Sequence, residues 1–179
     1  MSNHKEQNDA RLRMAIVAFS KALEINPMMV DAYNGIASCY FELFEFDSSV
    51  YNYKLALELD PFSTQALFGL GRSLMMLGKL NDAKTEFERA LQINDLDPES
   101  HFFLASILLK LDCIEMAEKH CAKCLELDPT NGYALYILAN ALLRRKPDNF
   151  ELNTLVTVLD KLEEYDADLR KDFKRMWLL

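Results

Sequence analysis

The chain of 179 residues has the length of one domain or of one continuous repeat array. Half of the residues are hydrophobic and 27% are charged, which is typical of a globular protein rather than a disordered one. A formal net charge of −8 argues against general nucleic-acid binding, which depends on Lys and Arg side chains that neutralise phosphates. No apolar run approaches the roughly 18 residues that a membrane span requires.

The N-terminal residues and the cysteines favour a reducing compartment. The first 13 residues are polar and carry no secretory signal. The four cysteines are unevenly spaced, in a chain of a size that does not need disulfide cross-links. We therefore expect reduced thiols and a cytoplasmic location, with the nucleus as the alternative.

A repeat of 34 residues runs through most of the chain. Two small columns recur at this interval, Ala22/Ala56/Ala90/Cys124 and Ala37/Gly71/Ala105/Ala139, beside a larger column, Phe19/Tyr53/Phe87/Cys121. Three of the units close with Pro27, Pro61 and Pro129. Each unit thus has two apolar stripes at helical spacing, separated by a polar turn. This pattern predicts helical hairpins that bury their apolar faces by stacking on their neighbours.

In chain order, residues 1–9 are expected to be disordered or extended, and residues 10–29 to hold the second helix, near 10–25, of an incomplete repeat. Complete repeats are expected at 30–63, 64–97 and 98–131, with first helices near 30–43, 64–77 and 98–111 and second helices near 47–59, 81–93 and 115–127. Gly78 suits the left-handed end of a helix, and Asp97 with Pro98 suits a helix start.

The C-terminal part departs from the repeat. A degenerate repeat is expected at 132–165, with helices near 132–145 and 150–164, and Pro147 interrupts it. A C-terminal capping helix is expected within 166–179, with Leu169, Phe173 and Trp177 on one side.

The fixed period, the alternation of small and large columns and the closing prolines resemble the tetratricopeptide repeat family over about residues 10–146. The resemblance implies an all-α fold, a right-handed superhelical solenoid of stacked antiparallel helical hairpins. It also implies that the first helices line a concave groove, and that the chain is a scaffold for protein binding.

Family geometry assigns a set of side chains to that groove, and the set is rich in apolar residues. It consists of Asn34, Ser38, Phe41, Phe68, Arg72, Met75, Phe102, Ser106, Leu109, Lys110, Tyr136, Asn140 and Arg144. An exposed apolar strip usually marks an interaction site, so we expect the groove to bind a hydrophobic, partly acidic peptide or helix. Phe68, Phe102 and Arg72 are expected to dominate binding, and truncation of either Phe should leave stability nearly intact. The alternative is that some of these residues only pack between hairpins.

One known use of the family, capture of the Hsp70 or Hsp90 C-terminal peptide, is not expected. It needs a Lys and an Asn at two groove positions of one first helix and a Lys/Arg pair in a later one. The corresponding pairs here are Asn34/Ser38, Phe68/Arg72, Phe102/Ser106 and Tyr136/Asn140.

No residue pattern predicts catalysis or a cofactor, because the sequence lacks a Gly-rich phosphate loop and a recognisable Ser/His/Asp set. His120, Cys121 and Cys124, with Cys113, come nearest to a metal site. A structural zinc site needs four ligands, however, and both Cys121 and Cys124 occupy core columns. We expect no enzyme activity, no cofactor and no bound metal, and we interpret His101 as a packed side chain.

The N-terminal helix lacks a hairpin partner, although solenoids normally cover their ends with polar residues. We therefore expect self-association, or contact within a multi-subunit complex, through Ile16, Phe19 and Leu23. The leading hypothesis is a non-enzymatic adaptor in a larger assembly. The alternatives are a chaperone like the tetratricopeptide chaperones of type III secretion, holding a translocator segment, and a regulatory part of a larger enzyme.

Overall fold

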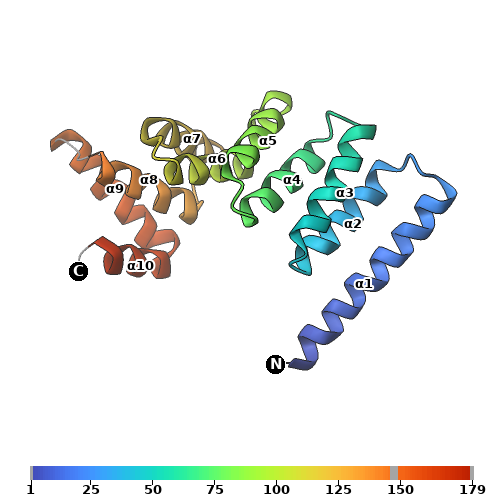
Figure 1. The fold of residues 1–179 in the computed structure, drawn as a ribbon. Helices are drawn as coiled ribbons and strands as arrows, with labels where there is room; N and C mark the ends of the chain where they lie inside the picture. The colour runs from blue at the N-terminus through green and yellow to red at the C-terminus, as the bar shows by residue number, and fades with distance from the viewer. Residues whose placement is uncertain (1, 146–148, 178–179) are drawn as a thin grey trace. The chain divides into compact units, whose positions relative to one another are not determined.

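The computed structural model describes residues 2–145 and 149–177, and side chains over residues 5–145 and 153–173. The described residues form ten α-helices joined by short turns (Figure 1). They divide into two compact units, Met1–Asn94 and Asp95–Leu179. No helix of the described residues combines the length and the hydropathy that a membrane span requires.

The first unit contains α1 (Ser2–Ile25), α2 (Val30–Glu42), α3 (Phe46–Leu59), α4 (Thr64–Met76) and α5 (Leu80–Ile93). Helix α2 packs on α3 and α4 packs on α5, as the predicted hairpins require. Helix α1 packs on α2, and α3 packs on α4, so each hairpin also contacts its neighbour (Figure 1). The predicted all-helical fold is therefore confirmed.

Close approach of the helices in this unit depends on small residues. A Cβ atom added to Gly69 in α4 would collide with the ring of Tyr53 in α3. Two buried hydroxyl groups complete the same layer: the Oγ of Ser49 donates to the carbonyl of Ala37 at 2.8 Å and lies 2.9 Å from the Oγ of Ser73. Glycine and serine thus let three helices meet where a larger side chain would separate them.

The second unit contains α6 (Pro98–Lys110), α7 (Ile114–Leu127), α8 (Gly132–Arg144), α9 (Asn149–Tyr165) and α10 (Ala167–Trp177). One buried cluster joins α8, α9 and α10 and consists of Leu135, Ala139, Leu142, Leu155, Val158, Leu162 and Phe173. Helix α10 packs on α8 and α9, and Leu169 packs against the same cluster. Pro147 and the side chain of Trp177 lie outside the described residues.

The helix ends follow local chemistry. Asp97 accepts a hydrogen bond from the backbone N–H of Ser100 at 3.0 Å, and Pro98 stands at the first helical position, as expected. Gly78 has a φ angle of 74°. Two further residues at the same repeat position also adopt the left-handed conformation, Phe44 with φ 61° and Asp112 with φ 60°.

The expectation for residues 1–9 was wrong over residues 2–9, which are helical because α1 begins at Ser2. The segment lacks the apolar stripe on which the prediction depended. It contains neither Gly nor Pro, however, so nothing in it stops the helix that Phe19 anchors on α2.

Candidate functional site

The predicted groove residues of the first unit lie on α2 and α4, which pack against each other. Their centre is Arg72. The guanidinium carbon of Arg72 lies 4.4 Å from the centre of the Phe41 ring and 5.9 Å from the centre of the Phe68 ring. The first unit therefore brings Phe41, Phe68 and Arg72 together.

Phe68 also takes part in the core. Its ring meets the fully buried ring of Phe87 edge-on, with the centroids 5.7 Å apart. The half-buried Phe68 side chain thus helps to hold α4 on α5 in addition to forming part of the surface. The expectation that its truncation leaves stability nearly intact does not agree with this packing.

The remaining groove residues of this unit differ in exposure. Ser38 is exposed and Met75 is half-buried, whereas Asn34 is only 2% exposed. The Asn side chain is shorter than the Phe at the equivalent position of α4, so it ends inside the packed layer. Asn34 was therefore wrongly predicted to line an accessible surface.

Tyr53 links this surface to the core. Burial raises the pKa of the Tyr53 hydroxyl, while a hydrogen bond with Ser38 and the positive charge of Arg72 lower it to a smaller extent. Glu42 raises this pKa to a smaller extent, so the surface around Arg72 contains a carboxylate in addition to the aromatic and hydroxyl groups.

The predicted groove residues of the second unit form a separate group on α6 and α8. Phe102 and Leu109 pack against the cluster of Ala105, Cys121 and Ile137. Tyr136 meets the buried ring of Phe173 in α10 edge-on, with centroids 5.9 Å apart. Much of this apolar surface is therefore engaged within the unit, which agrees with the alternative that some of the side chains only pack.

The polar residues of this second group are mostly engaged as well. Asn140 is 5% exposed and donates to the carbonyl of Tyr136 at 2.8 Å, so it was also wrongly predicted to be accessible. Arg144 donates to the carbonyl of Leu109 at 3.1 Å. Lys110 is exposed and Ser106 is half-buried. Whether Phe68 and Phe102 form one stripe stays a prediction, because they belong to different units.

The side chains that were predicted to mediate self-association are partly packed in the structure, and the self-association itself stays a prediction. Ile16, Phe19 and Leu23 are half-buried, and the ring of Phe19 lies against Gly35 of α2. The exposed apolar side chains of α1 include Met14 and Val17, at 72% and 54% exposure. Their spacing of three residues, one helical turn, was the signal that would have found them.

The cysteines and histidines form no cluster of metal ligands among the described residues. Cys39, Cys113, Cys121 and Cys124 are all free thiols. Burial raises the pKa of the Cys121 thiol, and it raises the pKa of Cys124 to about 11. His101 is buried beside His120, as its interpretation as a packed residue requires.

Family models described as tetratricopeptide repeat match residues 30–63, 64–97 and 98–131. A search of curated proteins finds no match. Solved structures are similar in fold. A structure described as MamA superposes with a TM-score of 0.80 at 19% identity, covering 89% of this chain and 94% of that one. YrrB, described as a tetratricopeptide protein with an unusual peptide-binding site, gives 0.78 at 23% identity, covering 93% and 84%. TTC0263, described as a thermophilic tetratricopeptide protein of Thermus thermophilus, gives 0.70 at 21% identity, covering 95% and 92%.

Proposed function

The chain belongs to the tetratricopeptide repeat family, and on that basis we propose that it is a non-enzymatic adaptor that binds an apolar, partly acidic peptide or helix. Proteins of this family generally serve as scaffolds for protein–protein interaction. The observation that carries the finer proposal is the surface of α2 and α4, where the guanidinium of Arg72 lies over the ring of Phe41 and near that of Phe68.

This arrangement suits a ligand that combines apolar and acidic groups. Stacking uses the faces of a guanidinium, whereas a carboxylate is bound by N–H groups in its plane, so the two contacts are compatible. The two neighbouring aromatic rings provide apolar area, and Met75 adapts to varied apolar shapes. Aromatic and Arg residues at the centre of an interface usually contribute most of the binding energy.

The experiment is selection of peptides from a random displayed library on the whole protein, followed by titration of the selected peptides. We expect sequences that combine apolar residues with Asp or Glu. Arg72→Ala should weaken their binding by more than about tenfold, since central Arg residues often contribute 2 kcal/mol or more.

The matched control is Arg89→Ala. Arg89 belongs to the same unit, is also partly exposed, and pairs with Glu86 on α5 rather than with the rings on α2 and α4. This variant removes the same charge and should bind the selected peptides as the wild type does. If both variants lose affinity equally, the effect is one of net charge. If Arg72→Ala loses no affinity, the Arg72 surface is not the binding site.

A further inference from the structure

A second groove lies on another side of α2, between α1 and α3. It has a volume of about 770 Å³, within the range of ligand-binding clefts. Ile36 of α2 forms part of its apolar floor, with Leu23 from α1 and Leu55 from α3. Tyr33, Tyr40 and Tyr51 add three aromatic side chains, of which Tyr51 is 64% exposed.

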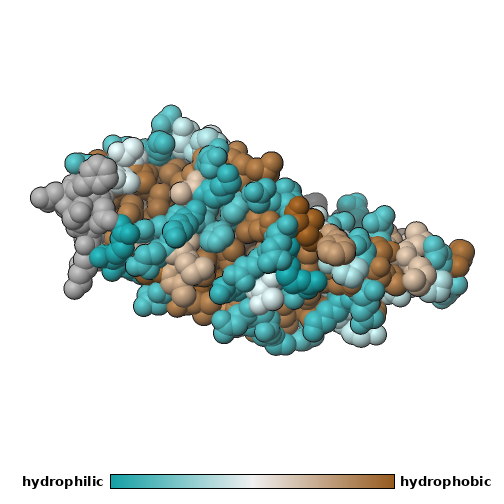
Figure 2. Space-filling view, turned by 90° about the horizontal axis from the view of Figure 1, so that it is seen from above, coloured by the Kyte–Doolittle hydropathy of each residue, from teal (hydrophilic) through white to brown (hydrophobic). Residues whose placement is uncertain are grey.

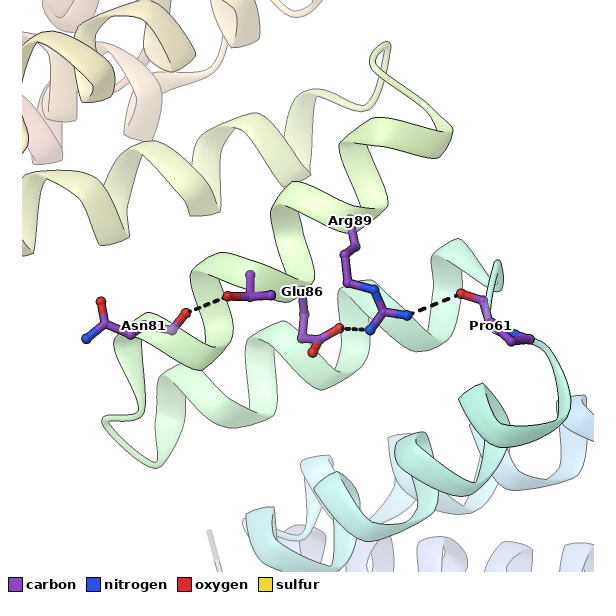
Figure 3. A network of polar contacts seen from close by, with 5 residues as sticks. Pro61, Asn81, Glu86 and Arg89 are labelled. Carbon is purple, nitrogen blue, oxygen red and sulfur yellow. Dashed lines mark hydrogen bonds and ion pairs between the residues drawn. The ribbon is translucent and has the colours of Figure 1, made fainter.

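The same groove recurs one repeat later in this unit, between α3 and α5 over α4, but its volume there is only about 290 Å³. Glu86 and Arg89 contribute to its lining. Their side chains pair at 2.6 Å, and Arg89 also reaches the carbonyl of Pro61 at 3.4 Å, as Figure 3 shows. The positions that precede this pair by one repeat hold Asn52 and Leu55. The shorter, uncharged pair leaves the first groove larger.

Charge distinguishes the two grooves as well. The smaller groove is lined by acids and bases together, including Lys54, Glu58 and Arg89. The larger groove has Ser20 in the place of Lys54 and Leu55 in the place of Arg89. The charged side chains among its described lining residues are Glu24 and Asp47. Aromatic rings beside carboxylates form a suitable environment for a cation, because a cation gains from both the ring faces and the negative charges.

We infer that the α1–α2–α3 groove binds a protein segment in which a Lys or Arg lies between apolar residues. The apolar side chains occupy the floor formed by Leu23, Ile36 and Leu55, and the cation lies among the tyrosines with Glu24 or Asp47 within reach. This site lies apart from the Arg72 surface and selects the opposite charge. It therefore adds a second class of partner to the proposed function and does not depend on it.

Within α2, the separation of the two sites follows from helical geometry. Tyr33, Ile36 and Tyr40 repeat at intervals of three and four residues and share one side of the helix. Phe41 lies on a different side, toward Arg72. One helix can thus contribute to both sites without the two ligands meeting.

The test fills the groove with the side chains that the chain uses one repeat later. The double variant Asn52→Glu/Leu55→Arg places the Glu86–Arg89 pair at the equivalent positions and leaves the net charge unchanged. The probes are short synthetic peptides in which Leu alternates with Lys, with Gln or with Glu. We expect the wild type to prefer the Lys peptide, and the double variant to bind it at least about tenfold more weakly.

Two further variants keep the result independent of folding. Tyr51→Ala changes an exposed side chain and should also weaken binding of the Lys peptide, while circular dichroism shows unchanged helicity. Glu86→Asn/Arg89→Leu is the matched control, because it opens the smaller groove and leaves the larger one intact, so wild-type binding at the larger groove should persist. Arg72→Ala should leave the Lys peptide unaffected.

The inference is overturned if folded Asn52→Glu/Leu55→Arg and Tyr51→Ala both bind the Lys peptide as tightly as the wild type. It is also overturned if the three peptides bind equally, since the groove would then not select a cation. Neither result bears on the Arg72 surface, whose own test uses acidic peptides and the Arg72→Ala variant.

Discussion

The Nδ1 atom of His101 in α6 lies 2.9 Å from the Nδ1 atom of His120 in α7. The other ring nitrogen of His101, Nε2, lies 3.0 Å from the carbonyl oxygen of Asp95. A carbonyl only accepts, so Nε2 of His101 carries a hydrogen and donates to Asp95. Only one hydrogen fits between the two Nδ1 atoms, so one ring donates to the other through it.

We predict that acid destabilises the protein through this pair. Burial, and to a smaller extent the charge of His101, lower the pKa of His120 from 6.5 to about 4. The folded state thus binds fewer protons than the unfolded state in this range. The contribution to the free energy of unfolding is complete above pH 6.5 and is lost as the pH falls toward about 4.

The measurement is urea unfolding across that pH range for the wild type and for His120→Gln. A Gln amide at position 120 is a hydrogen-bond donor that does not titrate, so the variant should lose less stability than the wild type on acidification. The carboxylates of the protein are the same in the wild type and in His120→Gln, so the difference between the two pH profiles reports position 120. Parallel pH profiles would show that the histidine pair does not contribute.

We predict that the positive φ angle of Gly78, rather than lack of space, determines how much a substitution there lowers the free energy of unfolding. At Gly78 no atom lies within 4 Å of an added Cβ, so only the φ angle of 74° opposes a side chain. Gly78→Ala should lower the free energy of unfolding by about 1 kcal/mol, and Gly78→Asn should lower it less, because Asn adopts this conformation more readily. Thermal unfolding of the two variants side by side measures the difference, and equal stability of Ala and Asn would contradict it.

Much of the fold can be predicted from the sequence because each repeat unit has the same packing requirements at the same positions. A small column permits close approach, a mostly aromatic column fills the gap, and Pro or a capping residue sets the next helix. Asp97 illustrates this, since a capping side chain followed by Pro98 predicts a helix start without tertiary information. Such local rules depend on neighbours in sequence and therefore survive without a structure.

The rest depends on contacts that the period does not contain. Phe44 adopts a left-handed conformation that a bulky residue rarely takes, so its residue type gave no warning. Asn34 shares a column with Phe68, but side-chain length decides that one is buried and the other reaches the surface. The α1–α2–α3 groove is the larger one and has Asn52 and Leu55 in its lining. At the equivalent positions of the smaller groove, Glu86 and Arg89 form an ion pair, and the sequence alone does not show that this pair forms.

The hydropathy of the surface does not by itself identify a binding site. On the face shown in Figure 2, hydrophobic side chains alternate with hydrophilic ones. Scattered apolar side chains are normal on proteins and do not identify a site by themselves. The Arg72 surface is distinguished instead by a guanidinium beside aromatic rings, and the α1–α2–α3 groove by tyrosines beside two carboxylates.

We predict that the thiols react in an order set by burial. Cys113 is half-buried, whereas Cys121 and Cys124 are fully buried, and burial raises the pKa of both of the latter thiols. Because the thiolate is the reactive form, Ellman's reagent should modify Cys113 in the folded protein, and Cys121 and Cys124 only on unfolding. Cys113→Ser should remove the fast phase. A chelator should leave the unfolding curve unchanged, and stoichiometric zinc near Cys121 would contradict the interpretation of these residues as core.

We predict that Phe68 has two separable roles. Phe68→Ala should lower the free energy of unfolding by about 1–3 kcal/mol, because the half-buried ring packs edge-on against Phe87. Phe68→Leu retains apolar volume against Phe87, so it should cost less than about 1.5 kcal/mol. Both variants remove the aromatic ring beside Arg72, and both should weaken binding of acidic, apolar peptides by similar factors. Urea unfolding and peptide titration, carried out well below the unfolding transition, measure the two effects independently. If Phe68→Leu binds as the wild type does, the ring acts through packing alone, and Phe41 is then the aromatic partner that defines the Arg72 surface.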